Sequence, residues 1–291
     1  MDQVKGRAEL YLLLATMLAA VGWIASKLVI QEMPSDVFIA ARFLLASLVL
    51  LPFCYRDIIK LRLTQIAAVS AVGVFLAGSL LTWIHAVSIS TSLSEGAFIM
   101  SLAMIIAPIT AWLLFQNKPK KAFWIALPLS VLGMALLALS NGWQVDLSQW
   151  YFLLASSLLS VHFVLNKRVI RNIKPLSSIC IQLFIVGIAG VIAASFVTNE
   201  PFEITSHLIF WFSVSTLVAT ALRYLLQTLG QHSVNMETAS LIMILEPIWT
   251  LLLSVVVLAE VIQLQKLIGG GIILLSLTVY IKLSKRSAKL N

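Results

Sequence analysis

Charged side chains are rare inside the apolar stretches of this 291-residue chain, and those few are the groups that could do chemistry. Arg42, Arg223 and Glu246 lie deep within such stretches, and Lys27 lies near the end of one. An ionisable group in a membrane is costly, so each is a candidate for binding a solute or carrying a proton. Three cations accompany one deep carboxylate. A solute carboxylate held by an arginine through paired hydrogen bonds would supply the missing negative charge.

Each of these groups also has a structural interpretation, which the sequence leaves open. Arg223 and Glu246 could pair with each other. Lys27 could extend its ammonium to the nearby interface. His85 and His162, the two histidines in apolar stretches, are either hydrogen-bonded core residues or parts of a proton relay.

The dipeptide Glu246-Pro247 interrupts an apolar stretch that otherwise reads as one membrane helix. Proline donates no N–H, so the carbonyl of Met243 loses its helical partner. An earlier segment, residues 94–117, repeats the pattern at an offset of 142 to 143 residues, with its proline, Pro108, about one helical turn out of register with Pro247. We predict helix breaks at Pro247 and at Pro108. The repeated pattern also predicts that the chain consists of two copies of one unit.

The composition is that of an all-α membrane protein, with 60% hydrophobic and 11% charged residues, whereas soluble domains carry about a quarter charged residues. A spanning helix needs about 20 apolar residues. Ten stretches meet this need, residues 9–30, 35–55, 66–88, 93–115, 122–140, 149–166, 175–198, 207–230, 235–258 and 262–283. The connections are too short for a soluble domain, so any chemistry must lie between helices.

Lysines and arginines outside these stretches fall almost wholly on alternate ends, which predicts that both termini are cytoplasmic. Two units of five helices, residues 1–141 and 142–291, would then enter the membrane from opposite sides as inverted repeats. Many transporters build two related gates around a midplane site in this way. The net charge of +8 is read as a topology signal, with no nucleic acid as partner.

Enzyme motifs, a cofactor loop and a His/Cys cluster with metal spacing are not found in the sequence. Cys54 and Cys180 lie in apolar stretches and are read as core residues. Most tryptophans, Trp23 among them, are read as an interfacial belt. The predicted cavity wall consists of Arg42, Trp83, His85, Asn166, Arg223, Tyr224, Gln227, Glu246 and Trp249.

Four segments resemble the drug/metabolite transporter superfamily, specifically the ten-helix EamA-type permeases. They are IASKLV (24–29), AARFLLASLVLLPF (40–53), SEGAFIMSL (94–102) and LEPIWTLLLSVVVLAE (245–260), and the helix after the last of them matches as well. The resemblance implies inverted five-helix halves, a central cavity lined mainly by the third, fourth, eighth and ninth helices, and alternating access by rocking helix pairs. Lys27, Arg42, Glu246-Pro247 and Glu260 match residues typical of the family. The sequence departs from the family at two places, with Gln116-Asn117 where an acidic residue is usual and Ala259 where glycine is usual.

These observations predict a secondary transporter that exports amino acids or similar small metabolites across a bacterial inner membrane. The partners are a small-molecule solute and the lipid bilayer, and proton coupling through Glu246 is left open. An importer or uncoupled facilitator of the same fold is the first alternative. A membrane-embedded enzyme or scaffold, or a channel, is a further one. The sequence does not specify the solute.

Overall fold

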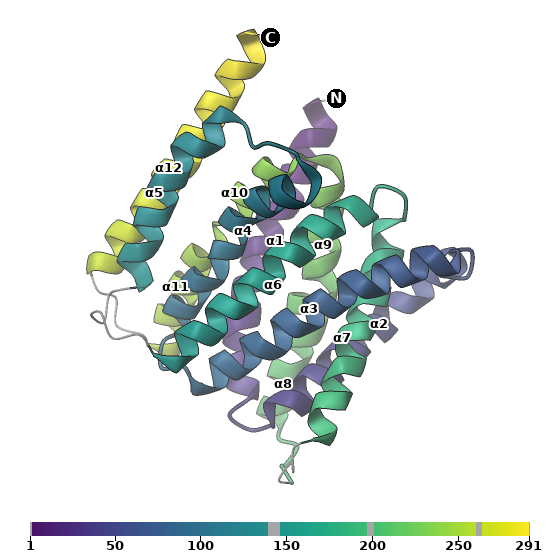
Figure 1. The fold of residues 1–291 in the computed structure, drawn as a ribbon. Helices are drawn as coiled ribbons and strands as arrows, with labels where there is room; N and C mark the ends of the chain where they lie inside the picture. Colours follow the sequence, from purple (N-terminus) through teal and green to yellow (C-terminus); the bar gives the residue numbers. More distant parts are fainter. Residues whose placement is uncertain (1, 139–145, 197–200, 260–263, 291) are drawn as a thin grey trace.

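The computed structural model describes residues 2–138, 146–196, 201–259 and 264–290, and within these ranges the regular structure is helical (Figure 1). Eight of its helices are long and apolar enough to cross a membrane. The remaining two predicted stretches correspond to α5 and α12, which are not among those eight. Glu260 lies outside the described residues.

The first half of the chain forms α1 (Asp2–Val29), α2 (Ser35–Ile58), α3 (Leu63–Ile89), α4 (Leu93–Phe115) and α5 (Lys121–Ala138). The second half begins with α6 (Leu147–Val169) and α7 (Pro175–Ser195). One continuous stretch then contains α8 (Ser206–Ser213), the π-helix η1 (Val214–Leu222) and α9 (Arg223–Ser233). The last elements are α10 (Met236–Met243), α11 (Glu246–Leu258) and α12 (Leu264–Leu290).

The two prolines predicted to break helices behave differently. Pro108 lies inside α4, which continues from Leu93 to Phe115, so the predicted break at Pro108 is wrong. At Pro247 the chain is divided into α10 and α11, with residues 244–245 forming a turn between them. Pro247 occupies the first turn of α11, where a missing N–H costs nothing because that group has no partner within the helix.

The helices pack in pairs that bring distant parts of the sequence together. α2 packs on α7, α3 on α6, and α1 on η1, α9 and α11. α5 and α12 pair with each other at one edge of the bundle (Figure 1). Between α2 and α7 the backbones approach closely, because a Cβ added to Gly190 would lie 2.7 Å from the backbone nitrogen of Ala40. α1 thus lies against the three elements that hold Thr220, Arg223 and Glu246.

Two lysines cap the ends of neighbouring helices. The ammonium of Lys27 in α1 donates to the carbonyls of Val87 and Ser90 at the end of α3, at 3.0 Å in both cases. Lys167 in α6 donates in the same way at the end of α9, to the carbonyls of Gln231, His232 and Val234. The last carbonyls of a helix have no partner within it, and a cation there also interacts favourably with the helix dipole.

Candidate functional site

A cavity of about 60 Å³ lies in the middle of the bundle. Its wall combines residues of α1, α2, α3, α4, α6, η1, α9, α10 and α11. The charged, polar and aromatic members are Trp23, Arg42, Ser79, Trp83, Ser101, Arg223, Tyr224 and Glu246. Its volume allows a few water molecules. The cavity thus joins the deep charges to aromatic side chains.

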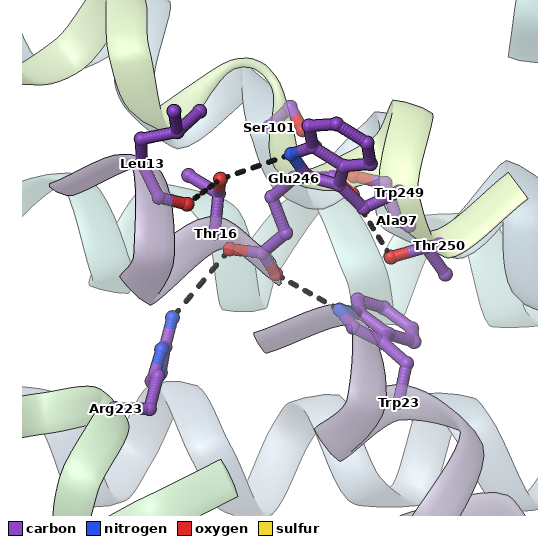
Figure 2. Close-up of polar contacts among 9 residues, drawn as sticks. All are labelled: Leu13, Thr16, Trp23, Ala97, Ser101, Arg223, Glu246, Trp249 and Thr250. Atoms are coloured by element: carbon purple, nitrogen blue, oxygen red, sulfur yellow. Dashed lines mark hydrogen bonds and ion pairs between the residues drawn. The ribbon is translucent and has the colours of Figure 1, made fainter. Parts of the chain in front are cut away.

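Glu246 is the carboxylate of this cavity and begins α11. One carboxylate oxygen, Oε1, accepts a hydrogen bond from the indole N–H of Trp23 at 2.9 Å (Figure 2). The other, Oε2, lies 3.5 Å from Nη2 of Arg223, and the two side chains are only 17% and 12% exposed. The start of a helix also favours a negative charge. The contacts with Trp23 and Arg223 fix the direction of this partly buried carboxylate.

Two further contacts hold the beginning of α11. The indole N–H of Trp249 donates to the hydroxyl of Thr16 on α1 at 3.1 Å (Figure 2). The hydroxyl of Thr250 donates to the carbonyl of Glu246 at 3.1 Å. With the bond from Trp23, α1 and α11 are joined by two tryptophan hydrogen bonds. Trp249 therefore fastens the helix start, and it does not line the cavity.

Arg223 has donors to spare. Its contact with Glu246 is long for a charged hydrogen bond, and its buried Nε atom has no partner within the described residues. The guanidinium carbon lies 4.3 Å from the centre of the Tyr224 ring, so the ring supports the planar group. An additional anion in the cavity could accept from this arginine without displacing Glu246.

Arg42 is more deeply buried, at 4% exposed, and its hydrogen-bond partners are neutral hydroxyl groups. Its Nε donates to the hydroxyl of Thr220 at 2.5 Å, and its Nη1 to the hydroxyl of Ser26 at 2.8 Å. The guanidinium carbon lies 5.4 Å from the ring centre of Phe38 and 5.2 Å from that of Phe43. Within the described part of the chain, carboxylates form ion pairs with Lys174, His207 and Arg223, and not with Arg42. The guanidinium group of Arg42 therefore has hydrogen-bond acceptors but no carboxylate partner within the described residues.

The π-helix η1 places the partner of Arg42. The hydroxyl of Thr220 donates to the carbonyl of Ser215, five residues earlier, at 2.8 Å. Opposite η1, α1 comes very close, because a Cβ on Gly22 would lie 3.0 Å from the Cβ of Ala219. π-Helical segments are rare and often mark functional sites. Here the segment sets the register that turns Thr220 toward the arginine.

Trp23 was missed by the sequence analysis, which assigned it to the interfacial belt. The structure buries it at 3% exposed, and its ring meets Trp83 edge to face with 5.1 Å between centroids. The sequence feature that indicates its burial is position. Trp23 lies one helical turn before Lys27, inside a predicted span and away from the ends of that span. Trp23 and Trp83 together make an aromatic wall beside Glu246.

Besides Trp249, three predicted wall residues lie away from the cavity. His85 is exposed, and its ring packs edge to face on Tyr151 with 4.6 Å between centroids. Gln227 is buried one turn after Arg223, and its Oε1 has no partner among the described residues. Asn166 is also buried. None of the three is among the residues that line the cavity.

Asn166 belongs instead to a buried polar network between α6, α7 and α9. Its side-chain N–H donates to Oε1 of Gln231 at 2.7 Å, and its Oδ1 accepts from Gln182 at 2.9 Å. Nε2 of His162 lies 2.8 Å from Oε1 of Gln182, so this nitrogen carries the proton. The network holds neutral groups only. Its geometry agrees with the interpretation of His162 as a hydrogen-bonded core histidine.

The model of the EamA-like transporter family matches this chain twice, over residues 6–139 and over residues 147–281. The chain belongs to the EamA-like transporter family. The superfamily predicted from the four sequence segments is confirmed. This EamA-like protein is accordingly a multi-pass membrane transporter, and its partners are a small-molecule solute and membrane lipid.

One curated relative and one solved structure extend this result. An uncharacterized transporter of Archaeoglobus fulgidus is 25% identical over 283 residues, which are 94% of this chain and 87% of the relative. A solved crystal structure superposes with a TM-score of 0.78 over 96% of this chain and 98% of its own, at 13% identity. At that identity the likeness shows the fold alone. Both matches thus cover at least 94% of the EamA-like transporter.

Proposed function

We propose that this protein is a secondary transporter that exports amino acids or similar small zwitterions through the central cavity. The observation that carries the proposal is the charge of the cavity wall, where Arg42 and Arg223 accompany one carboxylate, Glu246. A buried charge without a counterion is unfavourable. A solute carboxylate would restore neutrality at the site.

The wall also suggests how a zwitterion would lie. Its carboxylate would accept from the unused donors of Arg223, whose Nε has no partner in the described chain. Its ammonium would lie near Glu246 and the rings of Trp23 and Trp83, since aromatic faces attract cations. An amine that lacks a carboxylate would leave the arginine charge unbalanced and bind less tightly.

The cavity must change shape during transport, because about 60 Å³ holds water but not an amino acid. Residues 244–245, the turn between α10 and α11, are the natural hinge because the helical backbone is interrupted there. Movement at this hinge would shift Met243 and Glu246, which lie on either side of it and both line the cavity. This is how alternating access would reach the site.

The same proposal includes ten spans arranged as two inverted halves, residues 1–141 and 142–291. The two family matches support it, as does the pairing of α1 with α9 beside that of α3 with α6. The caps made by Lys27 and Lys167 are repeat equivalents, since each joins the first helix of a half to the end of the third. The start of α1 and the end of α12 lie at one end of the bundle (Figure 1), which supports an even number of crossings. We place this end in the cytoplasm of a bacterium and the protein in the inner membrane.

Glu246 is the group that would carry a coupled proton. Its carboxylate is the negative partner of Arg223 and the acceptor for Trp23. Protonation would weaken the contact with Arg223 and loosen the start of α11. A proton gradient would then favour the state in which this contact is broken.

Counterflow in proteoliposomes tests the proposal. Vesicles loaded with an unlabelled amino acid should exchange it for labelled amino acid in a saturable way, and much less for the amine that lacks the carboxylate. Arg223→Gln should remove this preference, whereas His85→Gln, which changes an exposed residue outside the cavity, should keep it. Equal exchange of amino acid and amine by the wild type, or no saturable exchange of any zwitterion, would overturn the proposal.

Direction and coupling need a second measurement on the same vesicles. An imposed proton gradient should drive net export in inside-out vesicles, and the slower residual exchange of Glu246→Gln should not respond to the gradient. Flux that follows only the solute gradient would identify a facilitator. Net movement into the cytoplasm would identify an importer.

A further inference from the structure

A second, larger pocket lies beyond the central cavity, with a volume of about 310 Å³. It is formed by the end of α4, the connection to α5, the end of α6 and the residue before α10. A volume near 300 Å³ is at the lower end of the range for ligand pockets. Nothing in the transport proposal uses this pocket.

The pocket is strongly basic. Four cations line it, Lys118, Lys167, Arg168 and Arg171, and carboxylates are not among its described lining residues. Lys167 is already engaged with the carbonyls at the end of α9. The other three are exposed and form no ion pair within the described residues. Like charges held together in one hollow repel each other, so a bound anion would relieve that repulsion.

Three neighbouring residues suit the pocket to a ligand that accepts several hydrogen bonds. The guanidinium carbon of Arg168 lies 4.4 Å from the ring centre of Phe115, which limits the orientations of that side chain. Asn117 and Asn235 add amide groups to the same wall. Arginine forks suit the oxygens of a phosphate, and amide N–H groups can donate to the remaining ones.

The position of the pocket is also defined by α4. Met100 and Met104 line the central cavity, whereas Pro108, Ala111 and Phe115 line the basic pocket. These spacings of three and four residues place all five on one face of the helix. From Met104 to Pro108 the distance along the axis is about 6 Å. The central cavity and the basic pocket therefore lie along the same face of α4, and the basic pocket is nearer the C-terminal end of that helix.

We infer that this basic pocket binds a phosphate group, carried either by an anionic lipid headgroup or by a water-soluble phosphate ester. Basic pockets between membrane helices are suited to such headgroups. The inference is independent of the transport proposal, because it concerns binding without flux.

The test uses two probe sets on the purified full-length protein. Glycerol 3-phosphate and inorganic phosphate are titrated in zwitterionic detergent and followed by calorimetry. Phosphatidylglycerol and phosphatidylcholine are compared in mixed micelles by native mass spectrometry, which counts retained lipids. Retention of phosphatidylglycerol alone would identify the lipid as the source. Binding of glycerol 3-phosphate would identify a soluble ester.

A matched pair of double variants locates the site. Arg168→Gln with Arg171→Gln removes two charges from the pocket. Arg56→Gln with Lys60→Gln removes two exposed charges elsewhere, and Arg56, like Arg168, has an aromatic ring beside its guanidinium group. Lost charge-assisted hydrogen bonds predict an affinity about tenfold or more weaker for the first variant only. Thermal midpoints without ligand check that both variants are folded.

Three results would overturn the inference. The first is that no phosphate probe binds the wild-type protein at millimolar concentration. The second is equal weakening in both double variants, which would mean general electrostatic attraction. The third is equal retention of phosphatidylglycerol and phosphatidylcholine with no binding of glycerol 3-phosphate.

Discussion

α4 and the pair α10–α11 occupy equivalent places in the two proposed halves, and each contains a proline, yet only the second is broken. α4 runs through Pro108 without interruption, whereas the turn at residues 244–245 separates α10 from α11. In α4 the positions equivalent to Glu246, offset by 142 to 143 residues, are Ala103 and Met104, which are apolar. A proline therefore permits a break in a membrane helix but does not produce one.

The difference lies in what holds each helix from outside. Glu246 is fixed by Trp23 on α1 and Arg223 on α9, and these contacts begin where α11 begins. Near Pro108 the corresponding polar contact is a hydroxyl pair, Thr110 with Ser160, at 2.8 Å. A carboxylate with two charged or indole partners can anchor a new helix start, and a neutral hydroxyl pair contributes less. The halves differ at the middle of the bundle, where the solute site is proposed.

At the helix ends the halves are alike. Lys27 and Lys167 cap equivalent helices, and α4 and α11 both end on a residue in the left-handed region, Gln116 at φ 58° and Ala259 at φ 53°. The two proposed halves therefore share the contacts at their helix ends and differ in the polar contacts at the middle of the bundle. This contrast predicts where substitutions affect transport and where they affect only stability.

Glu246→Gln should have the largest effect, because it removes the feature that separates the two halves. The amide keeps an acceptor for Trp23 but leaves Arg223 without its anion, at a cost of about 2 kcal/mol for a partly buried pair. The initial rate of counterflow should fall at least tenfold. Ala103→Ser, at the equivalent position of α4 that does not line the cavity, should change the rate less than twofold. A wild-type rate for Glu246→Gln would show that the carboxylate does not distinguish the halves.

Lys167→Met and Lys27→Met should destabilise the protein without a matching change in solute affinity. Each leaves carbonyls at a helix end without a donor, three carbonyls for Lys167 and two for Lys27. We expect losses of about 2 and about 1 kcal/mol in the free energy of unfolding, measured by denaturant titration in detergent micelles. Equal stability of Lys27→Met and wild type would mean that only the second half uses its cap.

The positions of the helices could be predicted from the sequence because apolar length and flanking charge fix where a chain enters and leaves a membrane. The fourth predicted span, residues 93–115, coincides with α4. The π-helix η1 inside the eighth span could not be predicted. Its register depends on Thr220 meeting Arg42, a residue 178 positions away that belongs to another helix.

The candidate site shows the same limit. Arg42, Arg223 and Glu246 could be singled out because charge in a membrane is costly wherever the side chain points. His85 and Trp83 could not be told apart, since α3 is apolar on all sides and gives no sign of which face looks inward. The structure turns Trp83 to the cavity and His85 to the surface.

Pro108→Ala and Pro247→Ala should respond in opposite ways if the comparison is correct. An alanine at 108 supplies an N–H to the Met104 carbonyl inside a continuous helix, which should raise the free energy of unfolding by about 1 kcal/mol. At 247 the residue lies in a first turn, where no helical acceptor is lost, so stability should stay nearly constant. Thermal midpoints of the two variants in one detergent provide the measurement. A gain at 247 as large as that at 108 would mean that α10 and α11 close into one helix.

Gln116→Gly and Ala259→Gly should give the smallest effects, and equal ones. Both residues hold the left-handed conformation, and their backbone N–H groups bond to the carbonyls of Trp112 and Ser254. Glycine adopts this conformation without the clash of a Cβ, so each variant should gain about 0.5 to 1 kcal/mol of stability. Ala107→Gly, inside α4, should lose a similar amount because its backbone is right-handed. A gain at 259 without one at 116 would restrict the shared end chemistry to the second half and weaken the case for a common repeat.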